Sequence, residues 1–128
     1  MPLHRLEHVL VLTDDLEATR AFYCDALGFE VAERPPLPFP GYWLSIDGVV
    51  CLHIAEREPY DAHAATLGLA GYAWPVDHVA FASDGYEQLV ERLRAAGVDS
   101  VQNDVPSAGV RQLFLDDPNG VRIELNLR

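Results

Sequence analysis

The sequence predicts an α+β fold in which two tandem βαβββ modules form an open, cupped mixed sheet with the helices outside. Two observations lead to this prediction. Segments with strand and helix periodicity follow the same order in both halves of the 128-residue chain. Equivalent polar residues are also evenly offset, because His8 and His78 stand 70 positions apart, as do Asp14 and Asp84. A period of this size indicates a duplicated architecture.

We expect one domain, with module one at about residues 5–55, a connector at 56–75 and module two at 76–128. In module one, residues 6–12 have the pattern of a strand. A helix then begins at Asp14, with Glu17 three residues on as in a capping box, and ends near Gly28.

The rest of module one contains three further strands. Residues 29–34 resemble a short strand, and four prolines between 35 and 40 then predict a loop. Asp47-Gly48 lies between two apolar runs, which is a strong hairpin signal. The connector is polar, and we expect a short helix near residues 61–67.

Module two repeats this order. A strand at residues 76–81 precedes a helix that we expect to begin at Asp84 and to end near Gly97, followed by a strand at 98–102. Its closing hairpin, residues 110–115 and 121–127, surrounds the sequence Asp-Pro-Asn-Gly at 117–120, which suits a tight turn.

The closing strand carries one carboxylate among alternating apolar residues. Its odd-numbered residues from Val121 to Leu127 are apolar and share one face. Arg122, Glu124 and Asn126 share the other face. Glu124 therefore points away from the helix-covered core.

Composition narrows the classes of function. The net charge of −11 and pI near 4.6 argue against nucleic-acid binding, which needs a basic surface. No apolar run approaches the length of a membrane span. Cys24 and Cys51 are isolated, so a reduced, cytoplasmic setting is the simplest expectation.

Four polar residues occupy matched places in the repeat. Each module has one potential metal ligand on its first strand and one on its last: His8 with His53, and His78 with Glu124. If the modules pair by a two-fold pseudo-symmetry, these positions converge. Imidazole and carboxylate together suit Zn, Ni, Co, Mn or Fe(II), and two histidines with one carboxylate also suit a non-haem iron site. A histidine on a strand can equally be a structural group, which is the alternative for His53 above all.

These segments resemble the glyoxalase / bleomycin-resistance / extradiol dioxygenase superfamily, also called the vicinal oxygen chelate superfamily. The resemblance rests on residues 6–9, the helix at 14–28, residues 76–80 and the ending Asp117-Pro118-Asn119-Gly120 with Ile123-Glu124-Leu125. The sequence is most similar to the uncharacterised glyoxalase-like members.

The resemblance implies one divalent metal held by His8, His78, Glu124 and His53. It also implies a homodimer whose site lies at or near the interface, a small bidentate oxygen substrate and, in some members, a thiol cosubstrate. Glu124 or His53 would be the catalytic residue that moves a proton. Glyoxalase I has a carboxylate where this chain has His53, so that particular reaction is in question.

Other residues are candidates for the substrate cavity. The aromatic candidates for its walls are Phe39, Tyr42, Trp43 and Phe114. Arg111 or Gln112 could hold an anionic end of the substrate. The alternative for the aromatics is ordinary core packing, and that for Arg111 is a solvated hairpin residue.

Two other functions remain open at this point. The same ligands would serve a non-haem iron dioxygenase, although ring-cleaving members usually contain two module pairs. A metal-free drug-binding protein of the bleomycin-sequestering type fits the acidic charge, but it does not require His8, His78 and Glu124. An isomerase or lyase in which the metal stabilises an enediolate or oxyanion is the favoured interpretation.

Overall fold

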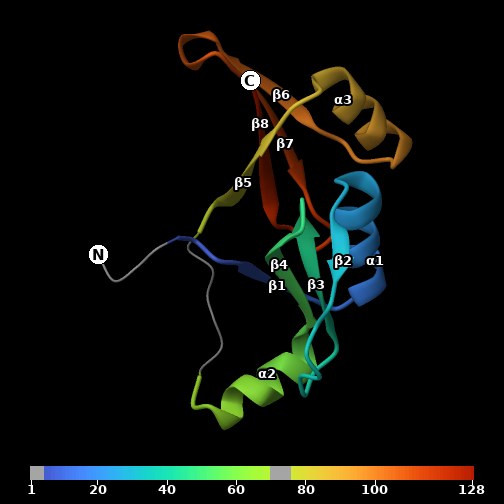
Figure 1. The fold of residues 1–128 in the computed structure, drawn as a ribbon, viewed down its shortest axis with the longest axis vertical. Coiled ribbons are helices and arrows are strands. Elements are labelled where there is room, and N and C mark those ends of the chain that lie inside the picture. Colours follow the sequence, from blue (N-terminus) through green and yellow to red (C-terminus); the bar gives the residue numbers. More distant parts are fainter. Residues whose placement is uncertain (1–4, 70–75) are drawn as a thin grey trace.

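The computed structural model describes residues 5–69 and 76–128, and these form two four-stranded mixed sheets with accompanying helices (Figure 1). The arrangement confirms the predicted α+β class with two tandem βαβββ modules. His4 and residues 70–75 of the predicted connector lie outside the described residues.

Module one forms the first sheet. Its elements are β1 (Val9–Thr13), α1 (Leu16–Ala21), a π-helical turn (Phe22–Ala26), β2 (Glu30–Ala32), β3 (Gly41–Ile46) and β4 (Val49–Glu56). The strand order is β1-β4-β3-β2, with β1 parallel to β4 and the other pairs antiparallel. The connector begins with α2 (Arg57–Thr66), which is longer and starts earlier than the predicted 61–67 helix.

Module two repeats this topology. Its elements are β5 (His78–Ser83), α3 (Tyr86–Ala95), β6 (Val101–Val105), a 3₁₀ turn (Pro106–Ala108), β7 (Val110–Asp116) and β8 (Arg122–Leu127). The order is β5-β8-β7-β6, the counterpart of the first sheet. β6 begins three residues later than the predicted strand. Within the described ranges, no helix combines the length and apolar character needed to cross a membrane.

The helix starts differ from the predicted caps. Asp15, not Asp14, caps α1, because its side chain accepts a hydrogen bond from the backbone of Ala18 at 3.0 Å. The start of α3 has no side-chain cap, and Gly85 at φ 69° occupies the capping position predicted for Asp84. Each cap therefore lies one residue after the predicted position, and both predicted capping boxes were wrong.

The predicted helix ends are confirmed. Gly28 at φ 84° and Gly97 at φ 71° follow the two helices in the left-handed conformation that glycine adopts without a Cβ penalty. The hairpin signal is also confirmed, since Asp47 and Gly48 both have positive φ, as a tight two-residue turn requires.

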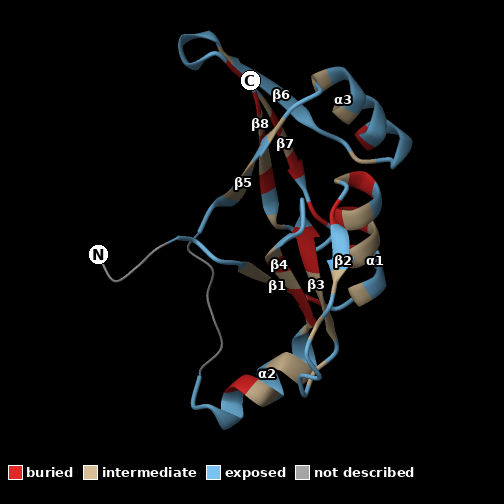
Figure 2. Cartoon of the chain, in the orientation of Figure 1, coloured by how far each residue is buried: buried red, intermediate tan, exposed pale blue. Residues whose placement is uncertain are grey.

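One hydrophobic core runs through both modules. Buried residues lie on strands of both sheets and on the first helix (Figure 2). Phe29 of module one meets Phe81 of module two edge to face, with ring centroids 5.5 Å apart. The modules of one chain thus meet through residues on their helical sides, and β1 and β5 are not paired with each other.

A buried polar network fixes this meeting. Asp117, which is 5% exposed, accepts a 2.9 Å hydrogen bond from the hydroxyl of Tyr23, which is fully buried in module one. The other carboxylate oxygen of Asp117 accepts from the backbone N–H groups of Asn119 and Val121, which closes the Asp-Pro-Asn-Gly turn. Asn119 donates to the buried Thr19 of α1 at 2.9 Å. The turn predicted from the sequence is therefore also the junction between modules.

A second contact supports the junction. Arg92 of α3 donates from Nε to the backbone carbonyl of Asp25 at 3.1 Å, at the end of the π-helical turn. Its guanidinium also reaches the carbonyl of Cys24 at 3.5 Å. A cation at a helix C-terminus satisfies carbonyls that have no partner in the helix.

We expect Tyr23→Phe to destabilise the protein by about 1.5–3 kcal/mol, because it removes a buried hydrogen bond to a carboxylate. The free energy of unfolding in urea measures the change. The matched control is Tyr60→Phe, since the Tyr60 hydroxyl makes no hydrogen bond to the described residues. Equal losses in the two variants would contradict a special role for the junction.

Candidate metal centre

Each sheet has one face packed on the core and one open face, and strand pairing determines which residues share the open face. In the first sheet, His53 of β4 pairs with Trp43 of β3 on one side and Leu10 of β1 on the other. Their neighbours Leu52, Leu44 and Val9 belong to the core side. The alternation of side chains along a strand therefore places His53 on the open face.

Three aromatic rings stack on this face. The ring of His53 lies between those of Trp43 and His8, with centroid distances of 4.4 and 3.9 Å. The interplanar angles are 5° and 14°, so the three rings are nearly parallel. The stack holds the two histidines of module one side by side.

The stack changes the acidity of His53. Burial first, and then the proximity of His8, lower the pKa of its imidazole to about 4. Glu7 acts in the opposite direction. His53 is therefore neutral at neutral pH, and a neutral imidazole is the form that binds metals.

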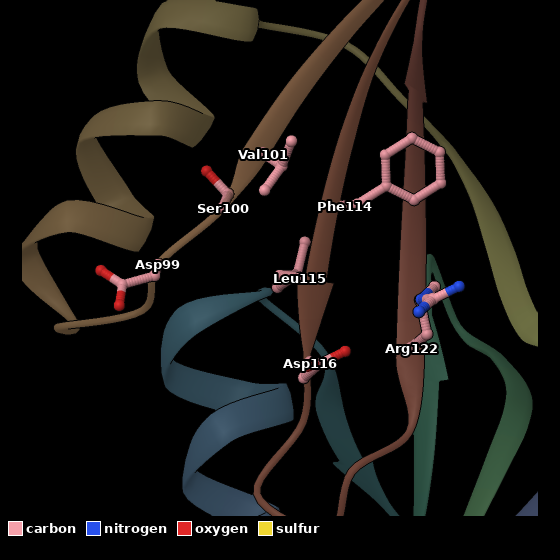
Figure 3. Close-up of a pocket in the computed structure, with 7 residues that line it drawn as sticks. All are labelled: Asp99, Ser100, Val101, Phe114, Leu115, Asp116 and Arg122. Carbon is pink, nitrogen blue, oxygen red and sulfur yellow. The ribbon is translucent and has the colours of Figure 1, made fainter.

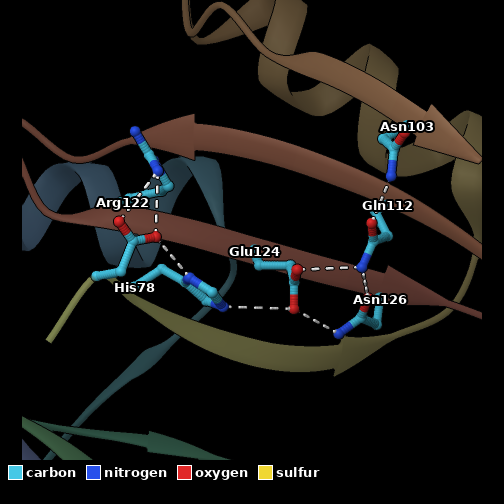
Figure 4. Close-up of polar contacts among 7 residues, drawn as sticks. His78, Asn103, Gln112, Arg122, Glu124 and Asn126 are labelled. Carbon is cyan, nitrogen blue, oxygen red and sulfur yellow. Dashed lines mark hydrogen bonds and ion pairs between the residues drawn. The ribbon is translucent and has the colours of Figure 1, made fainter.

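Module two brings His78 and Glu124 together on the open face of its sheet (Figure 4). Nε2 of His78 lies 3.9 Å from Oε2 of Glu124, which is too long for a hydrogen bond. Both atoms are of the kinds that bind zinc in proteins.

An acidic residue precedes the first-strand histidine in both modules and contacts its Nδ1. Asp77 lies 2.9 Å from Nδ1 of His78, and Glu7 lies 3.1 Å from Nδ1 of His8. Asp77 also bonds Arg122, and these contacts, that of His78 first, lower the pKa of its carboxyl group. A carboxylate on Nδ1 favours the tautomer whose Nε2 carries the free lone pair, as in many metal-binding histidines.

Glu124 is surrounded by amides. Gln112 of β7 donates to its Oε1, and Asn126 of β8 donates to its Oε2, both at 3.0 Å. Gln112 in turn accepts from Asn103 of β6 at 2.8 Å (Figure 4). The hydrogen-bonded chain therefore crosses three strands of the second sheet, β6, β7 and β8.

The four predicted ligands thus form two pairs in one chain, His8 with His53 and His78 with Glu124. Among residues 5–69 and 76–128, no group of three or more His, Cys, Asp or Glu side chains lies close enough to hold a metal ion. Each pair, called a half-site below, carries imidazole nitrogen or carboxylate oxygen atoms, donors that divalent metals prefer.

The predicted substrate residues divide between the two faces. Trp43, Gln112 and Phe114 lie on the open faces, since they pair with His53, Asn126 and Glu124 respectively.

Tyr42 and Arg111 point to the helical side. The Tyr42 hydroxyl bonds Glu17 of α1, and Arg111 lies over the ring of Tyr86 in α3 at 4.5 Å. Phe39 belongs to the loop before β3 and packs against Tyr60 of α2.

A cavity of about 440 Å³ lies where β6 diverges from β7, and Phe114 and Val101 contribute apolar walls to it (Figure 3). Arg122 and Asp116 line its polar part. Phe114 is the cross-strand neighbour of Glu124, and Arg122 is that of His78, so the cavity adjoins this half-site.

Sequence reasoning did not assign roles to Asp77 or Asn126. Both had a usable signal: Asp77 immediately precedes His78 as Glu7 precedes His8, and Asn126 shares the strand parity of Glu124.

This architecture agrees with the comparisons to known proteins. The model of the Glyoxalase/Bleomycin resistance protein/Dioxygenase superfamily matches residues 5–125, and the chain belongs to this superfamily.

The individual relatives have low sequence identity to this chain. Glyoxylase I 4 of Arabidopsis thaliana is 32% identical over 130 residues, covering 97% of this chain and 72% of that protein. Lactoylglutathione lyase of Salmonella typhimurium is 28% identical over 132 residues, with 94% and 90% covered. Among solved structures, the fosfomycin resistance protein of Listeria monocytogenes has a TM-score of 0.72 at 19% identity, covering 98% of this chain and 94% of its own, a likeness of fold alone.

We expect the imidazole of His53 to titrate near pH 4 in metal-free protein, measured by NMR. The unfolded chain protonates it near its ordinary 6.5, so the stability that neutral His53 contributes is complete above that pH and is lost as pH falls toward 4. Trp43→Ala exposes the ring and should raise this pKa toward 6.5, whereas Trp43→Phe keeps a covering ring and should change it less. An unchanged midpoint in Trp43→Ala would exclude the stack as the cause.

Proposed function

We propose that this protein is a divalent-metal-dependent enzyme of the glyoxalase-like type, an isomerase or lyase that acts on a small substrate with two neighbouring oxygens. The observation that carries the proposal is the pair of carboxylate-oriented histidines, His8 and His78, at equivalent places in the two modules. A structural role does not require both histidines to keep Nε2 available, and metal binding does.

The proposed ligands are His8, His78 and Glu124, with His53 as the fourth. The ion, one of Zn, Ni, Co, Mn or Fe(II), would supply a Lewis acid that polarises the substrate oxygens. The chain itself would move the proton. Glu124 and His53 are the two groups suited to this, since each stands on the last strand of its module. A positioned general base raises the reaction rate about 10²–10⁴-fold.

The proposal also includes a homodimer whose sites are shared. Each chain carries two half-sites, and among the described residues β1 and β5 are edge strands, each paired on one side only, β1 with β4 and β5 with β8. Unpaired edges are competent to pair with another chain. A site made from module one of one chain and module two of the other would contain all four ligands.

We expect tag-free wild-type protein to bind about one divalent ion per chain, measured by metal analysis and calorimetry. His78→Ala and Glu124→Gln should each weaken binding by more than about 100-fold, since they remove proposed ligands rather than their outer partners. His63→Ala on α2 is the control, because His63 packs against Phe39 away from both pairs. If wild type binds no better than the two site variants, the metalloenzyme proposal fails and a metal-free binding protein gains support.

Metal-loaded protein then separates the reaction classes. Turnover of methylglyoxal with glutathione would support a lyase with a thiol cosubstrate, as the name of the lactoylglutathione lyase relative suggests. Ring opening of catechol under ferrous iron would instead support the dioxygenase alternative.

Mixing two defective variants tests the shared site. His8→Ala damages module one and Glu124→Gln damages module two. After subunit exchange, half of the dimers are mixed, and each mixed dimer has one intact site if sites form between chains. We expect metal binding to return to roughly one quarter of the wild-type amount. No recovery, with exchange verified by mass spectrometry, would place each site within one chain.

A further inference from the structure

Both oxygens of Glu124 accept hydrogen bonds from side-chain amides. The side chain is 14% exposed, with Gln112 on Oε1 and Asn126 on Oε2. A third bond, from Gln112 Nε2 to Asn126 Oδ1 at 3.1 Å, links the two amides to each other. The carboxylate is therefore held from two directions on the open face.

The charge of Glu124 fixes the orientation of the amides. An ionised carboxylate only accepts hydrogen bonds, so each amide must present its N–H₂ group. Turning Gln112 over would place its carbonyl oxygen against Oε1 and would also leave the Asn103 amide without its 2.8 Å acceptor. The network is consistent only with Gln112 as a donor to Glu124.

The amides leave room for an ion. Each carboxylate oxygen has two lone-pair positions, and the amides use one on each oxygen. Oε2 lies 3.9 Å from Nε2 of His78. Held in this way, the carboxylate cannot turn away from the histidine without breaking at least one of the hydrogen bonds that the two amides donate.

Module one lacks this device. At the place equivalent to Glu124, His53 is held by ring stacking between Trp43 and His8. The cross-strand partner is aromatic in both modules, Trp43 for His53 and Phe114 for Glu124. The difference between the half-sites is thus the amide pair around Glu124.

We propose that Gln112 and Asn126 are positioning residues that hold Glu124 in the orientation of a metal ligand. The inference rests on the proposed metal site. It changes the role expected for Gln112, whose amide donates to Glu124 and Asn126 and is not free for an anionic substrate. Asn103 supports Gln112 from the neighbouring strand.

The test is calorimetric affinity for Co²⁺ together with the visible absorption spectrum of the Co²⁺-loaded protein. We expect Gln112→Met and Asn126→Leu, which keep approximate size and remove the donors, to weaken affinity about 10–100-fold each, the usual effect of losing an outer-shell partner. Both should also alter the ligand-field bands, which a role in folding alone would not do. Asn103→Leu should weaken affinity less, since it acts through Gln112.

Gln102→Met is the matched control, because Gln102 lies beside Asn103 on β6 but bonds Tyr86 and Asp104 and does not reach Glu124. It should leave affinity and spectrum unchanged. Circular dichroism and thermal unfolding identify any variant that fails to fold. If wild type binds no Co²⁺, the proposed function itself fails. If wild type binds and both amide variants match it in affinity and spectrum, the positioning role is wrong while the metal site stands.

Discussion

The hydrogen bond between Tyr23 and Asp117 is the contact on which the arrangement of this protein most depends. A carboxylate that is 5% exposed requires several donors, and it obtains them from its own turn and from a tyrosine of the other module. Arg92 and the Phe29–Phe81 contact reinforce the same boundary. The two modules are consequently joined through their helical sides, and both open faces remain available for chemistry.

The half-sites follow from strand parity and differ in how they are held. In each module the first and last strands run parallel and adjacent, which brings His8 near His53 and His78 near Glu124. Aromatic stacking holds the imidazole of His53, whereas hydrogen bonding from amides holds the carboxylate of Glu124. Each environment suits the ligand it holds, since a neutral ring tolerates partial burial and an anion needs donors.

Much of this could be predicted from the sequence. Alternation in residues 121–127 and the 70-residue offset were enough for the closing strand and the duplicated topology. The expected convergence of His8, His53, His78 and Glu124 does not occur among the described residues of one chain, where they form two pairs. The capping of α3 was not predictable from acidic spacing, because Gly85 in a left-handed conformation replaces the side-chain cap.

Tyr42 and Arg111 were named as candidates for the substrate cavity, but the sequence reasoning did not take into account that their side chains point to the helical side. Tyr42 lies one residue from Trp43, and a strand turns successive side chains to opposite faces. Arg111 likewise neighbours Gln112 and lies against Tyr86. The double use of the Asp-Pro-Asn-Gly turn, as a turn and as the acceptor for Tyr23, depends on a contact 94 positions distant that no local pattern encodes.

That distance has a consequence for synthesis of the chain on the ribosome. Tyr23 and Thr19 belong to module one, but their partners Asp117 and Asn119 emerge 94 and 100 residues later. Until then the Tyr23 hydroxyl lacks its acceptor, and Phe29 lacks the ring of Phe81 until module two has begun to form. Module one therefore reaches its final packing only after translation has passed Asn119, and its nascent form exposes apolar surface that the folded protein buries.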